Sequence, residues 1–365
     1  MESLRRGLME SIVEEQDLAV RDSGKTIIRQ TSLAGQIVVV GGLGGCGKSL
    51  FTPVFSTFER VEIQKYNYNL EHVCSLSLLD KIDASTAIAM IRLLTDLDLY
   101  NLMISRDTNL RRKDCSSIWQ NPHSWRYLHR LFQADDGQTI VKRIRETKPI
   151  LQVLVHHALM LSAPLLAALG GRVRIIEIIR HPLYMVKQLY PEVERTDPRA
   201  FTVFFEHKGQ AVPFFAKGWE DTYVQSNGMD KAIHYIERCS QWNPGYMRGL
   251  SDGERKQVLL IPFERFVLDP WPILRQLETF LNTGMTQATR RELRRQKVPR
   301  RLIADGMDRP VYRRCKWEPP QRGTDERREL DRRRAYAKEL ATDAGMELLD
   351  RMSRDYEATY LEGLL

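Results

Sequence analysis

Four apolar runs along the chain, three of them followed at once by glycine or polar residues, predict buried β-strands. They cover residues 36–40, 150–155, 173–179 and 258–261. Short runs this rich in Val, Ile and Leu are typical of strands covered on both faces in a parallel sheet. The segments between them carry apolar residues at helical spacing, most clearly at 83–100, 158–169 and 273–281. This alternation predicts an α/β fold, with a central parallel sheet flanked by helices.

Residues that start or stop helices mark the ends of several elements. Gly170-Gly171 ends the helix that begins at Ala158, and Asp269-Pro270 starts the helix that runs to Leu281. In the helix at 83–100, an apolar stripe is expected to face the core, and it consists of Ala87, Ile88, Ile91, Leu94 and Leu97. The segment that follows is expected to be packed together by Trp119, Trp125, Tyr127 and Leu128.

The chain divides into three parts in this interpretation. Residues 1–35 form a leader with a short helix and a small hairpin that turns at 22–25. Residues 36–320 form the main domain, in which 64–135 is a mostly helical insertion. Residues 321–365 form a C-terminal helical extension.

The first apolar run leads straight into a phosphate-binding loop pattern, Gly42-Leu43-Gly44-Gly45-Cys46-Gly47-Lys48-Ser49. A strand, a glycine-rich turn and a helix that begins near Lys48 are expected in that order. The glycines let successive backbone N–H groups point at one anion, and the helix N-terminus adds a positive end. Lys48 adds a point charge, and Ser49 can bind a phosphate oxygen or a metal. Pro53 predicts that this helix starts late or bends.

The cysteines and the apolar segments indicate where the protein resides. Among 365 residues there are five widely spaced cysteines and no Cys-x-x-Cys pair, which argues against a disulfide framework and a structural zinc site. No secretory signal and no uninterrupted membrane-spanning stretch occur, so we expect a cytoplasmic protein without a membrane partner. Cys46 is either a thiol with a lowered pKa at a helix N-terminus or a small residue that fits a tight turn.

Lys and Arg exceed Asp and Glu by 55 − 47 = 8, and the excess is concentrated at 290–316. A basic stretch of this kind suits a polyanionic partner or a ligand with several phosphates. A solvated helix face is the alternative for any single arginine in it.

Ligands of such sheets bind at the carboxyl ends of the strands, so the residues that follow the predicted strands are candidates. Arg180, in Arg180-His181-Pro182, can donate a forked pair of hydrogen bonds to a phosphate, or it can pair with an acid such as Glu177. His156 or His157 fits a general base near neutral pH. Because adjacent strand residues point to opposite faces, at least one of the two histidines is expected to be structural.

Two segments resemble those of sulfotransferases. Ile178-Ile179-Arg180-His181-Pro182 is similar to that family's 3′-phosphate-binding segment, and 260–270 is similar to its strand-Tyr-Glu-Asp-Leu segment, here with Phe263-Glu264. The resemblance covers about residues 36–320. It implies a fold of the P-loop nucleoside triphosphate hydrolase and sulfotransferase type. It also implies transfer of a sulfuryl group from 3′-phosphoadenosine 5′-phosphosulfate to a hydroxyl or amine of a small molecule or glycan.

The resemblance also implies roles for individual residues. The loop glycines, Cys46, Lys48 and Ser49 hold the 5′-phosphosulfate, Arg180 and Gln188 hold the 3′-phosphate, and Arg313 and Arg314 lie in a C-terminal loop that closes on the nucleotide. Lys48 stabilises charge on the leaving oxygen, and His156 or His157 deprotonates the acceptor. Glu264 is expected to orient a loop or an arginine. No metal is expected.

Two other functions stay open at this point. A kinase using ATP with Mg²⁺ fits the loop, but the predicted strands end in histidine and arginine and supply no aspartate to position the metal. A non-catalytic nucleotide or polyanion binder fits the basic stretch, but no recognised nucleic-acid-binding module occurs, so no specific nucleic-acid partner is expected. The oligomeric state is left open.

Overall fold

A computed structural model describes residues 25–112, 114, 116–134, 137–194, 201–303 and 323–363. The predicted leader helix, the hairpin turn at 22–24 and the C-terminal loop residues Arg313 and Arg314 lie outside these residues. The second arm of the predicted hairpin, Thr26-Ile27-Ile28, has irregular backbone and no strand partner among the described residues. Because the first arm lies outside the described residues, the hairpin itself stays a prediction.

The core is one parallel sheet of five strands in the order β2-β3-β1-β4-β7. Its strands are β1 (Gln36–Gly41), β2 (Lys65–Tyr66), β3 (Ile150–Leu154), β4 (Val173–Ile179) and β7 (Val258–Pro262). Every neighbouring pair is parallel, and β1 lies between β3 and β4. The predicted fold class is confirmed. Only the two-residue strand β2 was not predicted, because it lies inside the segment expected to be helical.

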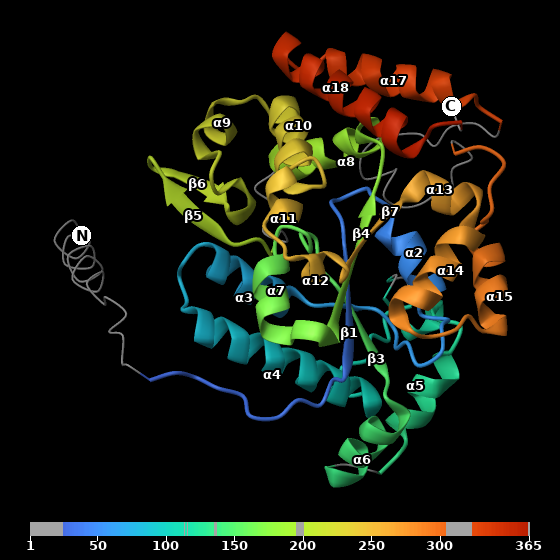
Figure 1. The fold of residues 1–365 in the computed structure, drawn as a ribbon. Helices are drawn as coiled ribbons and strands as arrows, with labels where there is room; N and C mark the ends of the chain where they lie inside the picture. Colours follow the sequence, from blue (N-terminus) through green and yellow to red (C-terminus); the bar gives the residue numbers. More distant parts are fainter. Residues whose placement is uncertain are drawn as a thin grey trace, which may run out of the picture.

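Helices cover both faces of the sheet (Figure 1). One face carries α3 (Tyr68–Leu78), α4 (Ala84–Met103) and α7 (Ser162–Leu169), and the other carries α2 (Lys48–Phe55), α13 (Phe263–Leu268), α14 (Pro270–Leu281) and α15 (Gln287–Arg295). The three central strands, β3, β1 and β4, are almost fully buried, as their apolar composition requires, whereas the edge strands β2 and β7 are partly exposed. The loop after β1 and the residues after β3 and β4 therefore meet at one edge of the sheet.

Several predicted helix boundaries differ from the observed ones. α7 begins at Ser162 rather than at 158, with Pro164 in its first turn, where a missing backbone N–H costs no helical hydrogen bond. α2 begins at Lys48 and continues through Pro53 to Phe55, so its start is not delayed. α14 begins at Pro270 and is capped by the side chain of Asp269, which confirms the predicted start signal.

Two packing predictions are wrong. Leu97, at the end of the predicted stripe on α4, is 47% exposed, whereas Ile91 of the same stripe is fully buried. Trp125 is 80% exposed, while Tyr127 two residues later is buried and bonds to Glu62. Helical spacing alone does not tell which of two aromatic residues two positions apart faces the core.

The C-terminal helices pack onto the part of the fold that follows β4. α8 (Pro182–Glu194) lies against α10 (Gly228–Cys239), α17 (Glu326–Lys338) and α18 (Asp343–Tyr360), which form the upper layer in Figure 1. An antiparallel hairpin of β5 (Phe204–His207) and β6 (Gln210–Pro213) stands beside them and was not predicted. None of the helices in the described ranges combines the length and the apolar composition that a membrane span requires.

The remaining helices are short or peripheral. They are α5 (Ser124–Leu131), α6 (Gln138–Thr147), α9 (Glu220–Gln225), α11 (Pro244–Arg248) and α12 (Asp252–Arg255), with 3₁₀ turns η2 (Ile118–Gln120), η3 (Gly170–Arg172) and η4 (Phe214–Ala216). The segments α5 and η2 lie beside α15, on the side of the sheet opposite to α7 (Figure 1).

Candidate active site

The glycine-rich loop connects β1 to α2 in the way the sequence predicts. Gly47 has a φ of +107° and immediately precedes the first helical residue, Lys48. A Cβ atom at position 47 would lie 2.2 Å from the ring of Phe263, so this position requires glycine both for its backbone and for space. The loop and the N-terminus of α2 together form the local geometry of an anion-binding turn.

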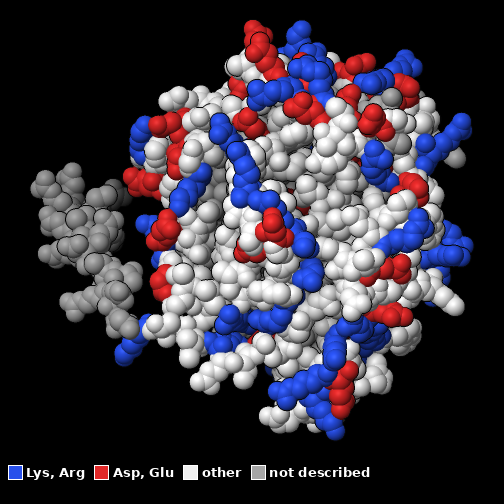
Figure 2. Space-filling model, in the orientation of Figure 1, with Lys and Arg blue, Asp and Glu red and all other residues white. Residues whose placement is uncertain are grey.

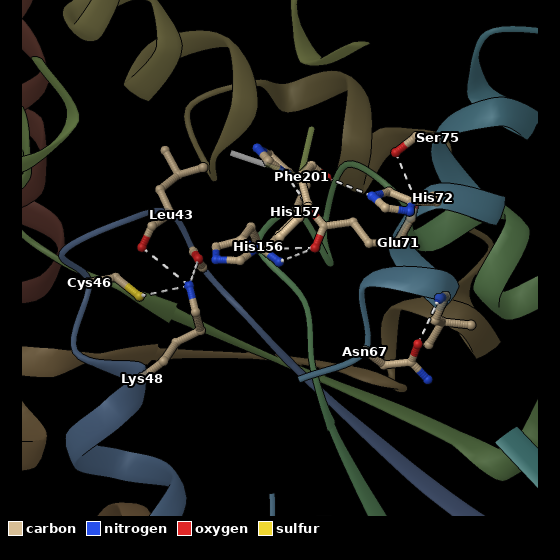
Figure 3. A network of polar contacts seen from close by, with 12 residues as sticks. Leu43, Cys46, Lys48, Asn67, Glu71, His72, Ser75, His156, His157 and Phe201 are labelled. Atoms are coloured by element: carbon tan, nitrogen blue, oxygen red, sulfur yellow. Dashed lines mark hydrogen bonds and ion pairs between the residues drawn. The ribbon is translucent and has the colours of Figure 1, made fainter. Parts of the chain in front are cut away.

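Lys48 points its ammonium group back into this loop. Its Nζ atom bonds the carbonyl oxygen of Gly42, lies 3.3 Å from the carbonyl oxygen of Leu43 and lies 3.8 Å from the Sγ atom of Cys46 (Figure 3). The side chain of Lys48 is buried, whereas Gly44, Gly45 and Ser49 are partly exposed. Among the described residues, the hydrogen bonds of the Lys48 ammonium group go to neutral loop atoms. Its positive charge is therefore available to neutralise an anion bound on the same loop.

Cys46 is a small buried residue and not a reactive thiol. Burial raises the pKa of its thiol, and the nearby charge of Lys48 only partly opposes this effect. Of the two interpretations of Cys46, the structure therefore supports the residue that fits a tight turn.

Arg180 lies at the same end of the sheet as the loop and contacts it directly. Its Nη1 atom donates a hydrogen bond of 2.8 Å to the carbonyl oxygen of Gly45. The guanidinium lies between two aromatic rings, 4.5 Å from the ring centroid of Tyr184 and 4.4 Å from that of Phe263. The acidic side chain that pairs with Arg180 is Glu264, whose Oε1 atom lies 3.8 Å from Nε of Arg180. The sequence suggested Glu177 for this pairing.

Glu264, at the start of α13, helps to fix the position of Arg180. Its buried carboxylate accepts hydrogen bonds from the backbone N–H of His181 at 3.1 Å and from the hydroxyl of Tyr356 at 2.7 Å. The predicted orienting role of Glu264 agrees with these contacts. His181 is buried and its Nε2 atom lies 3.1 Å from Glu357, which gives it a structural position.

Two further arginines extend the stack around Arg180. The guanidinium of Arg333, on α17, lies 4.3 Å from the ring centroid of Tyr184, and that of Arg300 lies 5.8 Å from the ring centroid of Phe263. Three cations thus alternate with two aromatic rings beside the loop. The sequence analysis placed Arg300 only within a general basic stretch and did not single out Arg333.

Gln188 also borders the loop. It lies on α8, and its Oε1 atom is 3.0 Å from the position that a Cβ atom on Gly45 would occupy. Glu192, one turn further along α8, comes within 2.7 Å of the corresponding position on Gly44. The helix α8 therefore brings one amide and one carboxylate to the glycine loop, so the loop is not lined by cations alone.

His156 and His157 share one partner, Glu71 of α3, which the sequence analysis did not identify. Glu71 Oε2 lies 3.1 Å from Nδ1 of His156 and also accepts its backbone N–H, while Oε1 lies 3.0 Å from Nδ1 of His157 (Figure 3). The histidines follow the end of β3 rather than continuing it, so the alternation expected of strand residues does not hold. Both side chains turn toward the same carboxylate.

The two histidines differ in exposure and bonding. His157 is buried, and its second nitrogen, Nε2, lies 2.6 Å from the hydroxyl of Tyr235. The side chain of His156 is 35% exposed, and its Nε2 atom has no hydrogen-bond partner in the part of the chain that the structure describes. Of the two, only His156 therefore has a ring nitrogen available to an incoming group.

The charges of this cluster favour an ionised Glu71 beside a neutral His157. Burial by itself raises the pKa of Glu71, but the hydrogen bonds and charges of the two histidines outweigh it and hold the pKa well below its usual range. Burial lowers the pKa of His157, more than the attraction of Glu71 raises it. The N–H at Nδ1 of each histidine then points at the carboxylate, which leaves Nε2 of His156 as a lone-pair acceptor.

A second carboxyl group, which the sequence suggested only as a partner for Arg180, lies beneath the loop. Glu177 on β4 is paired in register with Gly41 and is 1% exposed. Its Oε2 atom has no hydrogen-bond partner among the described residues. Burial raises its pKa to about 8, against the opposing charge of Lys48. Glu177 therefore carries a proton at neutral pH.

The described residues contain no group of three or more His, Cys, Asp or Glu side chains arranged to hold a metal ion. The residues gathered at this edge of the sheet are instead hydrogen-bond donors and cations around the loop, with a histidine–carboxylate pair next to them. Such a set can bind a phosphorylated ligand and accept a proton from a second molecule.

Comparison with known proteins gives matches to solved structures only. No protein-family model matches this chain, and no curated protein does either. A sulfotransferase from Mycobacterium avium is 13% identical over 93% of this chain and 80% of that chain, with a TM-score of 0.40. The sulfotransferase domain from the curacin biosynthetic pathway is 13% identical over 80% of this chain and all of that chain, with a TM-score of 0.39. The sulfotransferase domain from the Synechococcus PCC 7002 olefin synthase is 9% identical over 91% and 98%, with a TM-score of 0.38.

Proposed function

We propose that this protein is a sulfotransferase that takes a sulfuryl group from 3′-phosphoadenosine 5′-phosphosulfate and transfers it to a hydroxyl or amine. The observation that carries the proposal is the contact between Arg180 and the loop at Gly45. It gives the candidate site two separate cationic centres, the buried Lys48 and the arginine stack around Arg180. A nucleotide with phosphate groups at two ends of its ribose matches this pair of centres better than one with a single phosphate chain.

The donor fits the residues at the site. Lys48, the loop N–H groups and Ser49 would hold the 5′-phosphosulfate, and Arg180 with Gln188 would hold the 3′-phosphate. Arg180 now donates to a neutral carbonyl oxygen, and a phosphate oxygen is a stronger acceptor for the same N–H group. When bound, the donor supplies an activated sulfuryl group with a bisphosphate leaving group. Arg313 and Arg314 remain expectations from the sequence, because they lie outside the described residues.

The residues next to the loop suit the transfer itself. The Nε2 atom of His156 can take the proton of an acceptor hydroxyl, while Glu71 holds the ring through Nδ1 and stabilises the imidazolium that results. Lys48 and the start of α2 place positive charge where negative charge develops on the leaving oxygen. His157, buried and bonded at both nitrogens, supports Glu71 and does not reach the acceptor.

Aromatic rings lie on the side of His156 where an acceptor would approach. The ring of Tyr68 stacks on His156 with centroids 6.1 Å apart, and the ring of Phe201 lies 5.6 Å from Tyr68. Tyr68 and Phe201 are 41% and 61% exposed. This wall favours an acceptor, small molecule or glycan, that presents an apolar face beside its nucleophilic group.

The competing proposal is a kinase that uses ATP with Mg²⁺. It needs an ionised carboxylate near Ser49 to hold the metal shell. The end of β3 carries His156 and His157, and the buried carboxyl on β4, Glu177, has a pKa of about 8 and faces Gly41. The carboxylate that reaches the loop is Glu192 of α8, on the Gly44 side. The strand ends therefore supply no ionised carboxylate for a metal, which favours the metal-independent reaction.

Calorimetric titration with 3′-phosphoadenosine 5′-phosphate and, separately, with ATP and Mg²⁺ tests the proposal. We expect the bisphosphate to bind more tightly without metal, Lys48→Ala to weaken both ligands, and Arg180→Ala to weaken the bisphosphate selectively. Arg174→Ala is the matched control, since Arg174 lies at the other end of β4 and bonds the carbonyl oxygen of Gly171. Metal-dependent preference for ATP would replace this proposal by the kinase. Bisphosphate binding without sulfuryl transfer to any acceptor would indicate a non-catalytic binder.

A further inference from the structure

The outer face of α5 is apolar and unusually exposed. Trp125 and Phe132, seven residues apart and therefore on one side of the helix, are 80% and 85% exposed. Leu131 beside them is 45% exposed. Single exposed apolar residues are ordinary, but three large ones along one short helix, with Trp125 near its start and Leu131 and Phe132 at its end, form an exposed apolar surface.

The inner face of α5 holds the helix rigidly in this orientation. Tyr127 is buried, donates to Glu62 at 2.9 Å and accepts the backbone N–H of Ile63 at 2.6 Å. Arg130 binds the same carboxylate through both terminal nitrogens, at 2.7 and 2.9 Å. Because the buried side is fixed by this network, Trp125 and Phe132 cannot turn inward without breaking it.

A group of arginines lies beside this apolar face. Arg295 of α15 donates to the side chain and the carbonyl oxygen of Gln120 in η2, at 3.0 and 2.8 Å, which ties α15 to the start of α5. Arg126 lies on α5 itself, and Arg291 lies one helical turn before Arg295 on α15, on the same side of that helix.

Much of the charge on this side is uncompensated. Within the described ranges, five exposed cations on and after α15 have no acidic partner, and they are Arg290, Arg291, Arg294, Lys297 and Arg301. Figure 2 shows Lys and Arg along the right and lower right of the molecule, where Figure 1 has α15, α5 and α6.

We propose that this α5–α15 surface, defined by Trp125, Leu131, Phe132, Arg291 and Arg294, docks on an anionic lipid bilayer. Interfacial helices place Trp, Phe and Leu at the boundary of the hydrocarbon region and keep arginines at the headgroups. Each cation near a negatively charged leaflet adds to the attraction. The protein would then bind at the membrane surface without spanning it, in place of the expectation from the sequence that it has no membrane partner.

Two features favour a bilayer over a nucleic acid. The exposed apolar residues include Leu131, which offers no ring for base stacking, and they project from one helix rather than line a groove that tracks a strand. The surface also leaves the candidate active site accessible. α15 contacts the chain after the C-terminal end of α2, where Thr57 bonds Thr289 at 2.8 Å, whereas the phosphate-binding loop is at the N-terminal end of α2.

Flotation with lipid vesicles tests this proposal independently of the proposed function. We expect the full chain to float with vesicles of phosphatidylcholine and phosphatidylserine at 0.1 M salt, and to be released from them at 0.5 M salt. It should not float with vesicles of phosphatidylcholine alone. The double variants Trp125→Ala/Phe132→Ala and Arg291→Gln/Arg294→Gln should each weaken binding at least about tenfold.

Matched control variants remove apolar or basic side chains that lie outside the α5–α15 surface. Leu93→Ala/Leu97→Ala on α4 and Arg248→Gln/Lys256→Gln near α11 and α12 should bind vesicles as the natural chain does. Circular dichroism and thermal unfolding of every variant check that it is folded. The proposal is overturned by absence of flotation, or by flotation that none of the α5–α15 variants changes. RNA binding that depends only on Arg291 and Arg294, or self-association abolished by Trp125→Ala/Phe132→Ala without flotation, also overturns it.

Discussion

The guanidinium of Arg180 donates a 2.8 Å hydrogen bond to the carbonyl oxygen of Gly45, which joins the end of β4 to the glycine loop. The two segments are 135 residues apart in the chain. They meet because β1 and β4 are adjacent parallel strands whose carboxyl ends lie at one edge of the sheet. The aromatic rings of Tyr184 and Phe263 then hold the guanidinium flat between them.

Arg180→Ala is expected to reduce the affinity for 3′-phosphoadenosine 5′-phosphate by roughly 2–5 kcal/mol, because it removes a desolvated, charge-assisted hydrogen-bond donor. Arg180→Lys should recover only part of this loss, since an ammonium group cannot form the planar fork or stack between two rings. Calorimetry at fixed ionic strength measures both. If the natural chain and Arg180→Ala bind the bisphosphate with equal affinity, Arg180 does not contact this ligand.

Replacement of the two histidines should have different consequences. His156→Ala is expected to lower kcat by about 10²–10⁴-fold with little effect on nucleotide affinity, because it removes the proposed general base. His157→Ala should mainly lower the melting temperature, since the buried ring bonds both Glu71 and Tyr235. Sulfuryl-transfer kinetics and thermal unfolding of both variants separate the two roles. A greater loss of kcat in His157→Ala would reverse the assignment.

Glu71→Gln tests whether the carboxylate positions the base. The amide keeps the shape but loses the charge that supports an imidazolium, so kcat should fall while the nucleotide dissociation constant stays the same. The charge on Glu71, which lies 3.1 Å from Nδ1 of His156, is lost in this variant, so the pH–rate profile should differ from that of the natural chain. Glu347→Gln, at an exposed position on α18, is the matched control. An unchanged pH profile would leave Glu71 a purely structural role.

Local sequence signals predicted the sheet and one half of the site well. The strands observed at 36–41, 150–154, 173–179 and 258–262 were predicted to within one residue at each end, because each contains a short apolar run. The loop was found because its glycines and Lys48 are contiguous. Its relation to Arg180 followed from the rule that parallel strands end at one edge.

The other half of the site depends on contacts between distant segments, which local patterns do not contain. Glu71 lies 85 residues before His156 and looks like any acidic residue in the first turn of a helix. Arg333 and Tyr356 reach the surroundings of Arg180 from the C-terminal helices, which the sequence suggested only as an extension. Glu177 was noticed only as a partner for Arg180. Its burial beneath the loop depends on the register between β4 and β1.

Gly47→Ala should prevent the loop from forming its observed turn. The new Cβ atom would meet the Phe263 ring at 2.2 Å, on a backbone with a φ of +107°. We expect a loss of stability of about 1–3 kcal/mol together with a large loss of nucleotide affinity. Gly253→Ala is the control, since nothing lies within 4 Å of its Cβ position. Chemical denaturation and calorimetry measure the two effects. Normal affinity in Gly47→Ala would mean that the loop does not contact the ligand.

Glu177 predicts a dependence of stability on pH. Its pKa is about 8 in the folded protein, above the ordinary value of 4.5, so between these values the folded state holds a proton that the unfolded state has lost. The contribution of Glu177 to the free energy of unfolding is therefore complete below about pH 4.5 and falls as the pH rises toward 8, by about 1.4 kcal/mol per pH unit. Above pH 8 both states are ionised and this dependence ends.

Glu177→Gln removes the titrating group and keeps the volume, so it should raise the melting temperature relative to the natural chain at pH 8.5 and leave it nearly unchanged at pH 4.5. Thermal unfolding across that range compares the two chains, with Glu347→Gln as the exposed control.

Glu177 lies under Gly41 and near Lys48, so a bound anion that draws the ammonium group away should raise the pKa of Glu177 further. Nucleotide binding near pH 8 should then take up a proton, seen as a binding enthalpy that changes with the ionisation enthalpy of the buffer. The same buffer dependence in Glu177→Gln would assign that proton to another group.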